Sequence, residues 1–343
     1  MVKNMKPLVS ILIPAYNAEK WIADTLRSAI AQTWENKEII VVDDGSSDQT
    51  RAVVRQFESN CVRVVAQENQ GAAAARNKAF SLSQGEFIQW LDADDLISRD
   101  KITKQMQAFD RMVSKKMLLS SAWGRFFYRY GRAEFKSSAL WCDLTTTEWL
   151  SRKMEQNLHM QTATWLTSRE LADAAGPWNT QLLGDDDGEY FCRVLLQSAG
   201  VRFVPEAKVY YRAAGTSSLS YIGMSDRKME AQMVSMKAHI GYLRSLEDSP
   251  RTRAASIQYL QNWLVFFYPH RPDLVEEAEQ IAKELGGKLE PPQLSWKYSW
   301  IKALFGWGLA KRAQVFFPRL RWSVIRSCDK ILSKVNNEPV ENL

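Results

Sequence analysis

Cysteine is scarce in this sequence. The 343 residues include four cysteines, and no two of them form a C-x-x-C pair: Cys61, Cys142, Cys192 and Cys328. This spacing excludes a zinc ribbon and a dithiol redox motif, and the low number excludes a disulfide scaffold. The sequence therefore fits a reducing compartment.

Long apolar runs are missing as well. The longest stretch without an acidic residue, lysine or arginine is 254–270, and several polar residues interrupt it. A bilayer span needs about 20 mostly apolar residues, so we expect no transmembrane helix. The first 17 residues combine lysines with an apolar run, but Pro14 and Asn17 interrupt the run and no cleavage site of small residues follows. We therefore expect a buried first strand there and no targeting signal.

Most of the chain has no excess of one charge sign. Residues 1–293 carry 36 basic and 36 acidic side chains, whereas residues 294–335 carry nine basic residues and a single acid, Asp329. The net charge of +6 and the pI near 9.0 therefore come from the tail. The body of the protein needs no polyanionic partner, and we expect no binding of nucleic acid.

Strands and helices alternate over the first hundred residues of a chain whose composition, 45% hydrophobic and 24% charged, is that of a globular protein. We expect strands at 9–13, 38–42, 62–66 and 87–91, and helices at 17–33 (capped by Asn17), from the 43–48 turn to about 57, and at 71–82. Such alternation predicts an α/β fold, with a mostly parallel central sheet and helices on both faces.

Acidic residues cluster where these strands end. Ligands of open parallel sheets collect beyond the carboxyl ends of the strands, where this chain has residues 14–16, 43–48 and 92–95. The glycine motifs that commonly bind nucleotide phosphates, G-x-G-x-x-G and G-x-x-x-x-G-K-[ST], do not occur. Carboxylates would repel a diphosphate unless Mg²⁺ or Mn²⁺ lay between them. Asp94, helped by Asp92, is the candidate metal ligand; the alternative is a simple helix start.

Four segments within residues 8–96 resemble glycosyltransferase family 2: SILIPAYNAEKWIADTLRSAIAQTW, EIIVVDDGSSDQT, NQGAAAARNKAF and GEFIQWLDADD. The resemblance implies the GT-A fold, which is Rossmann-like, and an inverting reaction of a nucleotide-diphosphate sugar, with a UDP-sugar foremost. It implies that Asp92 and Asp94 form a D-x-D pair that binds Mn²⁺ or Mg²⁺. It also implies a nucleotide-sugar site, with Pro14 and Tyr16 at the base pocket, Asp44 bonded to the base and Arg76 near the diphosphate: Pro14, Ala15, Tyr16, Asp44, Arg76, Asp92, Ala93 and Asp94.

A second acidic cluster, at 183–193, resembles the acidic motif of the same family at the start of a helix. In that motif an arginine follows the general base by six residues, so Arg193 indicates Asp187 as the base, with Asp186 as the next candidate. Crowding among the neighbouring aspartates, Asp185 included, would raise one of their pKa values through like-charge repulsion. The alternative is a charge cluster that only stabilises the helix dipole.

Two further positions are compared with the family. Gly176-Pro177-Trp178 resembles its turn before the acidic motif, so Trp178 is a candidate to stack on the acceptor or donor sugar; packing is the alternative. Many members have a histidine near the metal and the diphosphate where this chain has Ala214, so either a metal or phosphate contact is missing or Arg212 or Thr216 replaces it. Ala214 also keeps open a second hypothesis, a catalytically inactive nucleotide-binding or membrane-scaffolding homologue.

Three regions are expected along the chain: a catalytic domain at 1–220, divided into a nucleotide-sugar half (1–96) and an acceptor half (97–220), a helical region at 221–290, and a basic, tryptophan-rich tail at 291–343. The helical region should contain helices at 226–246, 251–267 and 272–285, the first two separated by Asp248-Ser249-Pro250. In the acceptor half we expect a helix at 98–113 capped by Ser98, a strand at 159–167 and a helix capped by Ser168. Aromatic residues within 118–135 fit either an acceptor platform or a packed core.

The tail alternates aromatic and basic residues. Trp296, Trp300, Leu304 and Trp307 recur at helical spacing and form one face. Basic, tryptophan-rich amphipathic helices lie in the membrane interface, where each lysine or arginine gains about 1 kcal/mol from anionic lipids. We therefore expect residues 294–335 to bind an anionic membrane surface; the alternative is a helix packed on the catalytic domain.

These patterns and the resemblance together predict an inverting, metal-dependent glycosyltransferase. The enzyme would be cytoplasmic and peripheral on the inner face of the cell membrane. It would transfer a sugar to a hydroxyl of a glycan or a lipid-linked glycan, in the biosynthesis of cell-surface polysaccharide or glycoconjugates. A sugar nucleotidyltransferase of the same fold is disfavoured because its glycine-rich N-terminal loop is missing.

Overall fold

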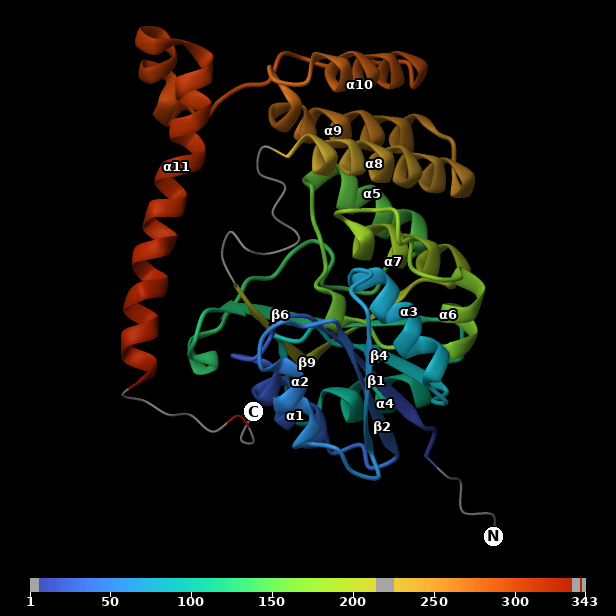
Figure 1. Ribbon diagram of the computed structural model, residues 1–343. Helices are drawn as coiled ribbons and strands as arrows, with labels where there is room; N and C mark the ends of the chain where they lie inside the picture. Colours follow the sequence, from blue (N-terminus) through green and yellow to red (C-terminus); the bar gives the residue numbers. More distant parts are fainter. Residues whose placement is uncertain (1–5, 214–224, 335–339, 341–343) are drawn as a thin grey trace.

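The computed structural model describes residues 6–213, 225–334 and 340. Its N-terminal half contains a five-stranded sheet of order β3-β2-β1-β4-β8 (Figure 1). The first four strands are parallel, and β8 is antiparallel to β4: β1 Val9–Ala15, β2 Lys37–Asp44, β3 Val62–Gln67, β4 Phe87–Trp90 and β8 Thr167–Ser168. The four strands expected in this part of the sequence are confirmed.

Helices cover both faces of this sheet, as the alternation predicts: α1 Ile22–Ile30, α2 Thr50–Arg55 and α3 Ala72–Leu82. Successive residues of β1 enter two different cores, since Ile11 and Ile13 belong to one cluster and Leu12 to the other. A strand buried on both faces needs apolar residues at consecutive positions. This explains the consecutive apolar residues 11–13 of β1 and confirms the α/β class.

A second, four-stranded sheet of order β5-β9-β6-β7 lies beside the first: β5 Leu96–Ile97, β6 Leu118–Phe126, β7 Glu134–Phe135 and β9 Val201–Arg212. The long strands β6 and β9 are parallel, with a register shift between Ser121 and Ala122. Several aromatic side chains of 118–135 pack against other rings; Trp123 meets Tyr211 edge-on, with the centroids 5.9 Å apart. This packing favours the core interpretation over an acceptor platform.

The helices of the second half surround and extend these sheets: α4 Lys101–Asp110, α5 Thr146–Gln156, α6 Arg169–Ala175, α7 Asp186–Gln197, α8 Asp226–Leu246, α9 Pro250–Phe267 and α10 Pro272–Glu284. In Figure 1, α8, α9 and α10 form a layer above α5 and α7. Apolar residues of α8 and α9 share one core with α7 and with the sheet residue Trp90. The helices expected at 226–246, 251–267 and 272–285 are thus present, and the domain limits at 220 and 290 stay predictions.

The tail forms one long helix, α11 Ser299–Ser333, which follows the 3₁₀ turn η3 Trp296–Tyr298. It runs down one side of the molecule from the α8–α10 layer toward β6 (Figure 1). Gly306 interrupts it with non-helical angles (φ 81°, ψ 171°). Large apolar side chains remain exposed along it, among them Trp300, Leu304 and Ile331. None of the helices in the described ranges is long and apolar enough to cross a bilayer.

One carboxylate anchors α11 to the body. The Asp329 side chain accepts hydrogen bonds from the backbone N–H groups of Tyr128 (2.9 Å) and Arg129 (3.2 Å) and from Nε of Arg129 (2.7 Å). Hydrogen bonds to a charged group contribute about 1.5–3 kcal/mol each. Asp329→Ala should therefore detach the end of α11 and raise the rate of tryptic cleavage in the tail at least about tenfold.

Limited proteolysis followed by mass spectrometry measures this effect. Ser327→Ala, a change of an exposed residue in the same turn that removes no trypsin site, serves as the control. Cleavage of the tail that is equally fast in wild type and in Asp329→Ala would contradict the anchoring role.

Asn17 does not cap a helix, contrary to the prediction. It lies in the left-handed region (φ 49°), and α1 begins only at Ile22. The Asn17 Oδ1 atom instead accepts hydrogen bonds from the Ser47 N–H (2.9 Å) and hydroxyl (3.2 Å). Asparagine tolerates this backbone conformation better than most residues. Its side chain therefore ties the end of β1 to the 43–48 turn.

Ser98 does not cap a helix either, contrary to the prediction. Helix α4 begins at Lys101, with Asp100 at the N-cap, and the Ser98 hydroxyl donates to Asp100 Oδ1 at 3.2 Å. The predicted strand at 159–167 is also mostly absent, since only Thr167–Ser168 pairs with β4. The cap at Ser168 is confirmed, because its hydroxyl accepts from the N–H of Leu171.

Candidate active site

The predicted nucleotide-sugar residues gather at one edge of the first sheet. In the parallel register Ala15 lies beside Asp43, and Leu91 continues β4 by donating its N–H to Leu12 O at 3.0 Å. Residues 14–16, Asp44 and 92–94 therefore emerge together at the carboxyl ends of β1, β2 and β4. Tyr16 is 53% exposed at this edge. Its ring is available for stacking on a flat ligand.

Asp44 organises the segment that leads into α3. Its carboxylate accepts hydrogen bonds from Gln67 Nε2 (2.7 Å) and from the N–H groups of Gln70 (3.0 Å) and Gly71 (2.8 Å). Gly71 has φ 90°, which L side chains rarely adopt. The buried Asp44 thus fixes the loop between β3 and α3, and a contact with the base stays a prediction.

Arg76 of α3 joins the two acidic clusters. Its guanidinium donates to Asp92 Oδ1 at 2.9 Å and to Asp186 Oδ2 at 2.7 Å, and the residue is 6% exposed. Trp178 lies under it, with the guanidinium carbon 4.4 Å from the ring centroid. Charge-assisted bonds from one planar guanidinium fix both partners in position. The D-x-D segment and the start of α7 therefore belong to one site.

The D-x-D turn is held from behind by Arg212. The side-chain Nε of Arg212 donates to the backbone oxygen of Asp94 at 2.8 Å. The backbone N–H of Arg212 donates to Asp95 Oδ1 at 2.8 Å. Its guanidinium lies between two rings, 4.2 Å from Trp21 and 4.5 Å from Phe126. Arg212 is thus fully engaged in positioning this turn. Ala214 and Thr216, the other positions considered for the missing histidine, lie outside the described residues.

Asp94 presents the carboxylate of the pair that no arginine engages. Burial, together with the neighbouring charge of Asp92, raises the pKa of Asp94 to about 6, against the opposing effect of Arg212. Neither oxygen accepts a hydrogen bond from another residue in the described part of the chain. This carboxylate is therefore available to an external cation.

Asp187 lies in the first turn of α7. Its Oδ2 accepts from the Thr162 hydroxyl at 3.3 Å. Burial raises its pKa to about 7, and the charges of Asp186 and Asp185 add to that rise. The carboxyl group is thus poised to take up a proton near neutral pH. Sequence reasoning missed Thr162, because no pattern around this residue distinguishes it.

The helical region fixes the start of α7. Asp185 has left-handed backbone angles (φ 55°), and its Oδ2 accepts from the Ser235 hydroxyl of α8 at 2.5 Å. His239 of α8 approaches the same oxygen to 3.9 Å. A Cβ atom at Gly188 would collide with the Asp185 carboxylate, so a larger residue at this position would displace that carboxylate from Ser235. The acidic cluster is therefore held from α8 as well as by Arg76.

Arg193 and Trp178 support this region from within the protein. Arg193 pairs with Glu189 at 2.7 Å, one helical turn away, and donates to Pro177 O at 2.8 Å. Trp178 is only 2% exposed and stacks on Tyr190 with the centroids 4.1 Å apart. A ring buried in this way supports Arg76 and offers no face to a sugar. The packing alternative for Trp178 is the one that the structure favours.

The donor set fits a cation that also binds substrate phosphates. No three His, Cys, Asp or Glu side chains converge as a metal site in the parts of the chain that the structure describes. Mg²⁺ commonly uses one or two carboxylates and completes its shell with water and phosphate oxygens. The free carboxylate of Asp94 and the second oxygen of Asp92 supply such a partial set.

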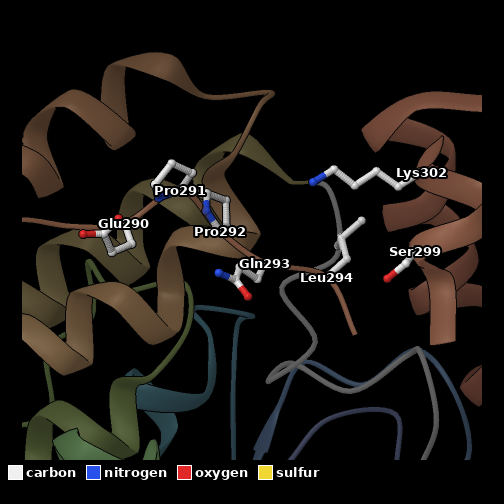
Figure 2. Close-up of a pocket in the computed structure, with 7 residues that line it drawn as sticks. All are labelled: Glu290, Pro291, Pro292, Gln293, Leu294, Ser299 and Lys302. Atoms are coloured by element: carbon white, nitrogen blue, oxygen red, sulfur yellow. The ribbon is translucent and has the colours of Figure 1, made fainter. Parts of the chain in front are cut away.

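A separate cavity of about 390 Å³ lies far along the chain from these residues, where the linker enters α11. Figure 2 shows Ser299 and Lys302 of α11 facing linker residues 290–294. Its side chains include one carboxylate, Glu290, and one amine. This set lacks the paired carboxylates of the strand-end site.

Comparison with known sequences agrees with the geometry. The model of the family described as "Glycosyl transferase family 2" matches residues 10–170. The putative teichuronic acid biosynthesis glycosyltransferase TuaG of Bacillus subtilis is 45% identical over 107 residues, 30% of this chain and 42% of the relative. The Escherichia coli enzyme named UDP-Glc:alpha-D-GlcNAc-diphosphoundecaprenol beta-1,3-glucosyltransferase WfgD is 42% identical over 100 residues, 29% of this chain and 40% of its own. The match thus spans about two fifths of the length of these relatives.

Solved structures extend the likeness to most of the chain. TarS of S. aureus in complex with UDP-GlcNAc has a TM-score of 0.58 at 18% identity, over 81% of this chain and 88% of that one. The mannosyltransferase PcManGT of Pyrobaculum calidifontis, in complex with GDP-Man and Mn²⁺, has a TM-score of 0.54 at 17% identity, over 94% and 85%. These values establish a common fold. The chain thus has the fold of GT-A glycosyltransferases, and its residues 10–170 match the model of glycosyltransferase family 2.

Proposed function

We propose that this protein is a glycosyltransferase that uses a nucleotide-diphosphate sugar. The Arg76 bridge carries the proposal: it pairs with Asp92 and Asp186 and leaves the carboxyl groups of Asp94 and Asp187 without an ion pair among the described residues. Two carboxyl groups at the candidate site, one with a pKa of about 6 and one with a pKa of about 7, suit different roles in one reaction. Asp94 suits the donor side and Asp187 the acceptor side.

The proposed reaction is a single displacement with inversion. The acceptor oxygen forms a bond to the anomeric carbon while the bond from that carbon to the diphosphate oxygen breaks. Asp187 takes the hydroxyl proton, and Thr162 and the helix start orient its carboxylate. Asp187 is a better base than Asp186, because Arg76 already engages Asp186. A divalent cation, Mn²⁺ or Mg²⁺, bound by Asp94 and Asp92, would neutralise the departing diphosphate.

The nucleotide-sugar side of the site comprises the residues implied by the resemblance. Tyr16 would stack on the base beside Pro14 and Ala15, and the Asp44-anchored loop would border it. Asp92, Ala93 and Asp94 would contact the ribose and the diphosphate. A UDP-sugar is our first choice of donor, since the relative WfgD is named for UDP-Glc and the TarS structure holds UDP-GlcNAc.

A glycan or lipid-linked glycan is the proposed acceptor, in cell-surface polysaccharide or glycoconjugate biosynthesis. TuaG is named for teichuronic acid biosynthesis, and the name of WfgD specifies a diphosphoundecaprenol acceptor. The exposed apolar side chains of α11 and the nine basic residues of 294–335 fit attachment to an anionic membrane. We infer a peripheral enzyme on the cytoplasmic face of the membrane.

Hydrolysis of donors tests the proposal. Wild type, incubated with UDP- and GDP-sugars, should cleave one donor slowly with Mn²⁺ or Mg²⁺ and should lose this activity in EDTA. Asp94→Asn should lower the rate at least about a hundredfold, since a bound cation contributes several kcal/mol. Asp110→Asn, an exposed change in α4, is the control.

Each outcome of this screen is informative. A wild type that binds no donor in a metal-dependent manner, while folded, would contradict the site assignment. Binding without any turnover, even with glycan acceptors present, would favour the inactive nucleotide-binding or scaffolding homologue, the hypothesis that Ala214 supports. Turnover that survives Asp94→Asn would exclude Asp94 as the metal ligand.

A further inference from the structure

A groove of about 1060 Å³ lies between α11 and the β6–β7 end of the second sheet. One wall comes from residues 125–136 and the other from residues 317–332 of α11. Phe127 and Trp322 face each other across it, with the ring centroids 5.6 Å apart. The groove is large enough for part of a lipid-like ligand.

The polar part of the groove is strongly basic. Six cationic side chains line it: Arg125, Arg129, Arg132, Lys136, Lys297 and Arg321. Its two carboxylates are already paired, Asp329 with Arg129 at 2.7 Å and Glu134 with Lys136 at 3.0 Å. Four cations therefore remain without an acidic partner in the described ranges, a concentration of charge that suits a compact polyanion.

The remaining lining is apolar and belongs to the same helix. Phe317, Trp322, Ile325 and Leu332 line the groove, and each is at least 40% exposed. Exposed aromatic and aliphatic side chains beside unpaired cations are costly in water unless a ligand covers them. A ligand that joins an anionic head to an apolar chain would satisfy both halves.

The groove adjoins the D-x-D turn through a single side chain. Arg212 donates from its guanidinium to Phe127 O at 3.2 Å, on the groove wall, and from Nε to Asp94 O at 2.8 Å. Phe126, which lines the groove, lies under the same guanidinium at 4.5 Å. Arg212 thus links the backbone of the groove wall at Phe127 with the backbone of the candidate metal ligand Asp94.

We propose that this groove binds the diphosphate and the first isoprene units of a polyprenyl diphosphate that carries the acceptor sugar. The inference rests on the proposed function and specifies the acceptor for the same active site. A diphosphate concentrates more negative charge than the single phosphate of a phospholipid, which suits four unpaired cations better. The apolar chain would lie along α11, whose remaining exposed face meets the membrane.

Binding of farnesyl diphosphate, a short soluble member of this class, tests the proposal by titration calorimetry on the full chain. The groove variant combines Arg125→Gln, Arg132→Gln and Arg321→Gln. The matched control combines Lys302→Gln, Arg312→Gln and Lys330→Gln, three exposed cations of α11 outside the groove. Both variants lose the same charge, and circular dichroism checks that both are folded.

The groove variant should bind farnesyl diphosphate roughly a hundredfold more weakly than wild type, and the control within about threefold. Inorganic diphosphate should bind wild type at least about tenfold more weakly than farnesyl diphosphate, because it lacks the chain. Both variants should bind vesicles containing phosphatidylglycerol more weakly than wild type, and to the same extent. This measurement distinguishes general attraction to an anionic membrane from binding in the groove.

Equal weakening of farnesyl diphosphate in both variants would overturn the proposal. So would a wild type that prefers inorganic diphosphate. Binding of a UDP-sugar to the same wild-type sample distinguishes failure of the groove proposal from failure of the glycosyltransferase proposal. A wild type that binds the UDP-sugar but not farnesyl diphosphate would reject the groove proposal alone. A wild type that does not bind the UDP-sugar would reject the glycosyltransferase proposal.

Discussion

Asp187→Asn is expected to lower the rate of sugar transfer by about 10²–10⁴-fold, the usual contribution of a general base. Asparagine keeps the size of the side chain and the contact with Thr162, but it cannot take the acceptor proton. Binding of the donor should persist, because Arg76 engages Asp186 and Asp92 and not Asp187. Transfer kinetics measured beside donor binding separate these effects.

The pH profile identifies the base more directly. Burial and the adjacent aspartates raise the pKa of Asp187 to about 7, so kcat/KM should fall as pH drops below 7 and the carboxylate becomes protonated. The matched control is Asp186→Asn, which should retain an acid limb in the profile, whereas the residual activity of Asp187→Asn should lose the limb near pH 7. If the acid limb near pH 7 is unchanged in Asp187→Asn, a residue other than Asp187 is the general base.

The same raised pKa has a consequence for stability. Between the pKa of an unfolded aspartate, near 4, and about 7, Asp187 is protonated in the folded protein but ionised in the unfolded chain. The stabilisation from this proton uptake is lost as pH rises through the folded pKa. Asp187→Asn should therefore raise the melting temperature by a few degrees at pH 8, for about 1 kcal/mol, and change it little at pH 4.

Arg76→Met should be the most disruptive single change at the site. It removes the shared partner of Asp92 and Asp186, whose side chains are only 26% and 22% exposed, and leaves both charges without compensation. Breaking a buried pair costs about 3–5 kcal/mol, and partial exposure reduces this to roughly 2–3. The melting temperature should fall by roughly 5–10 °C, and transfer activity should be lost.

A combined variant distinguishes the loss of stability caused by uncompensated charges from the loss of activity. Adding Asp92→Asn and Asp186→Asn to Arg76→Met removes the uncompensated charges, so thermal stability should recover by at least half while activity stays absent. Arg76→Lys keeps the charge but lacks the planar fork that reaches two carboxylates, and it should retain stability better than activity. Calorimetric unfolding in parallel with donor hydrolysis measures both. Stability that does not recover in the triple variant would contradict the charge argument.

The first half of the fold was predictable because its signals are local. Each of the four parallel strands of the first sheet is a mostly apolar run followed by polar residues, and such runs favour strands. That Tyr16 and Asp94 lie at the same edge of the sheet was predictable, because ligands of open parallel sheets collect beyond the carboxyl ends of the strands. The helices at 226–246 and 251–267 likewise followed from periodicity and from the Asp248-Ser249-Pro250 break.

The rest depended on tertiary contacts that no spacing encodes. The role of Asn17 depends on Ser47, thirty residues away, and that of Arg76 on Asp186, 110 residues away. Trp178 had two equal interpretations from sequence, and only its stacking on Tyr190 distinguishes them. The groove was invisible for the same reason, since its two walls are almost two hundred residues apart in the chain.

The hydrogen bond from Ser235 to Asp185 bears on how this chain can be recombined with its relatives. Helix α8 shares a core with the sheet and holds the first turn of α7 through that serine. A chimera that exchanges only the N-terminal nucleotide-sugar half keeps this support, whereas one joined between α7 and α8 separates the candidate base from the helix that orients it. Crossover points that preserve the support of α7 by α8 should therefore lie before α5 or after α9.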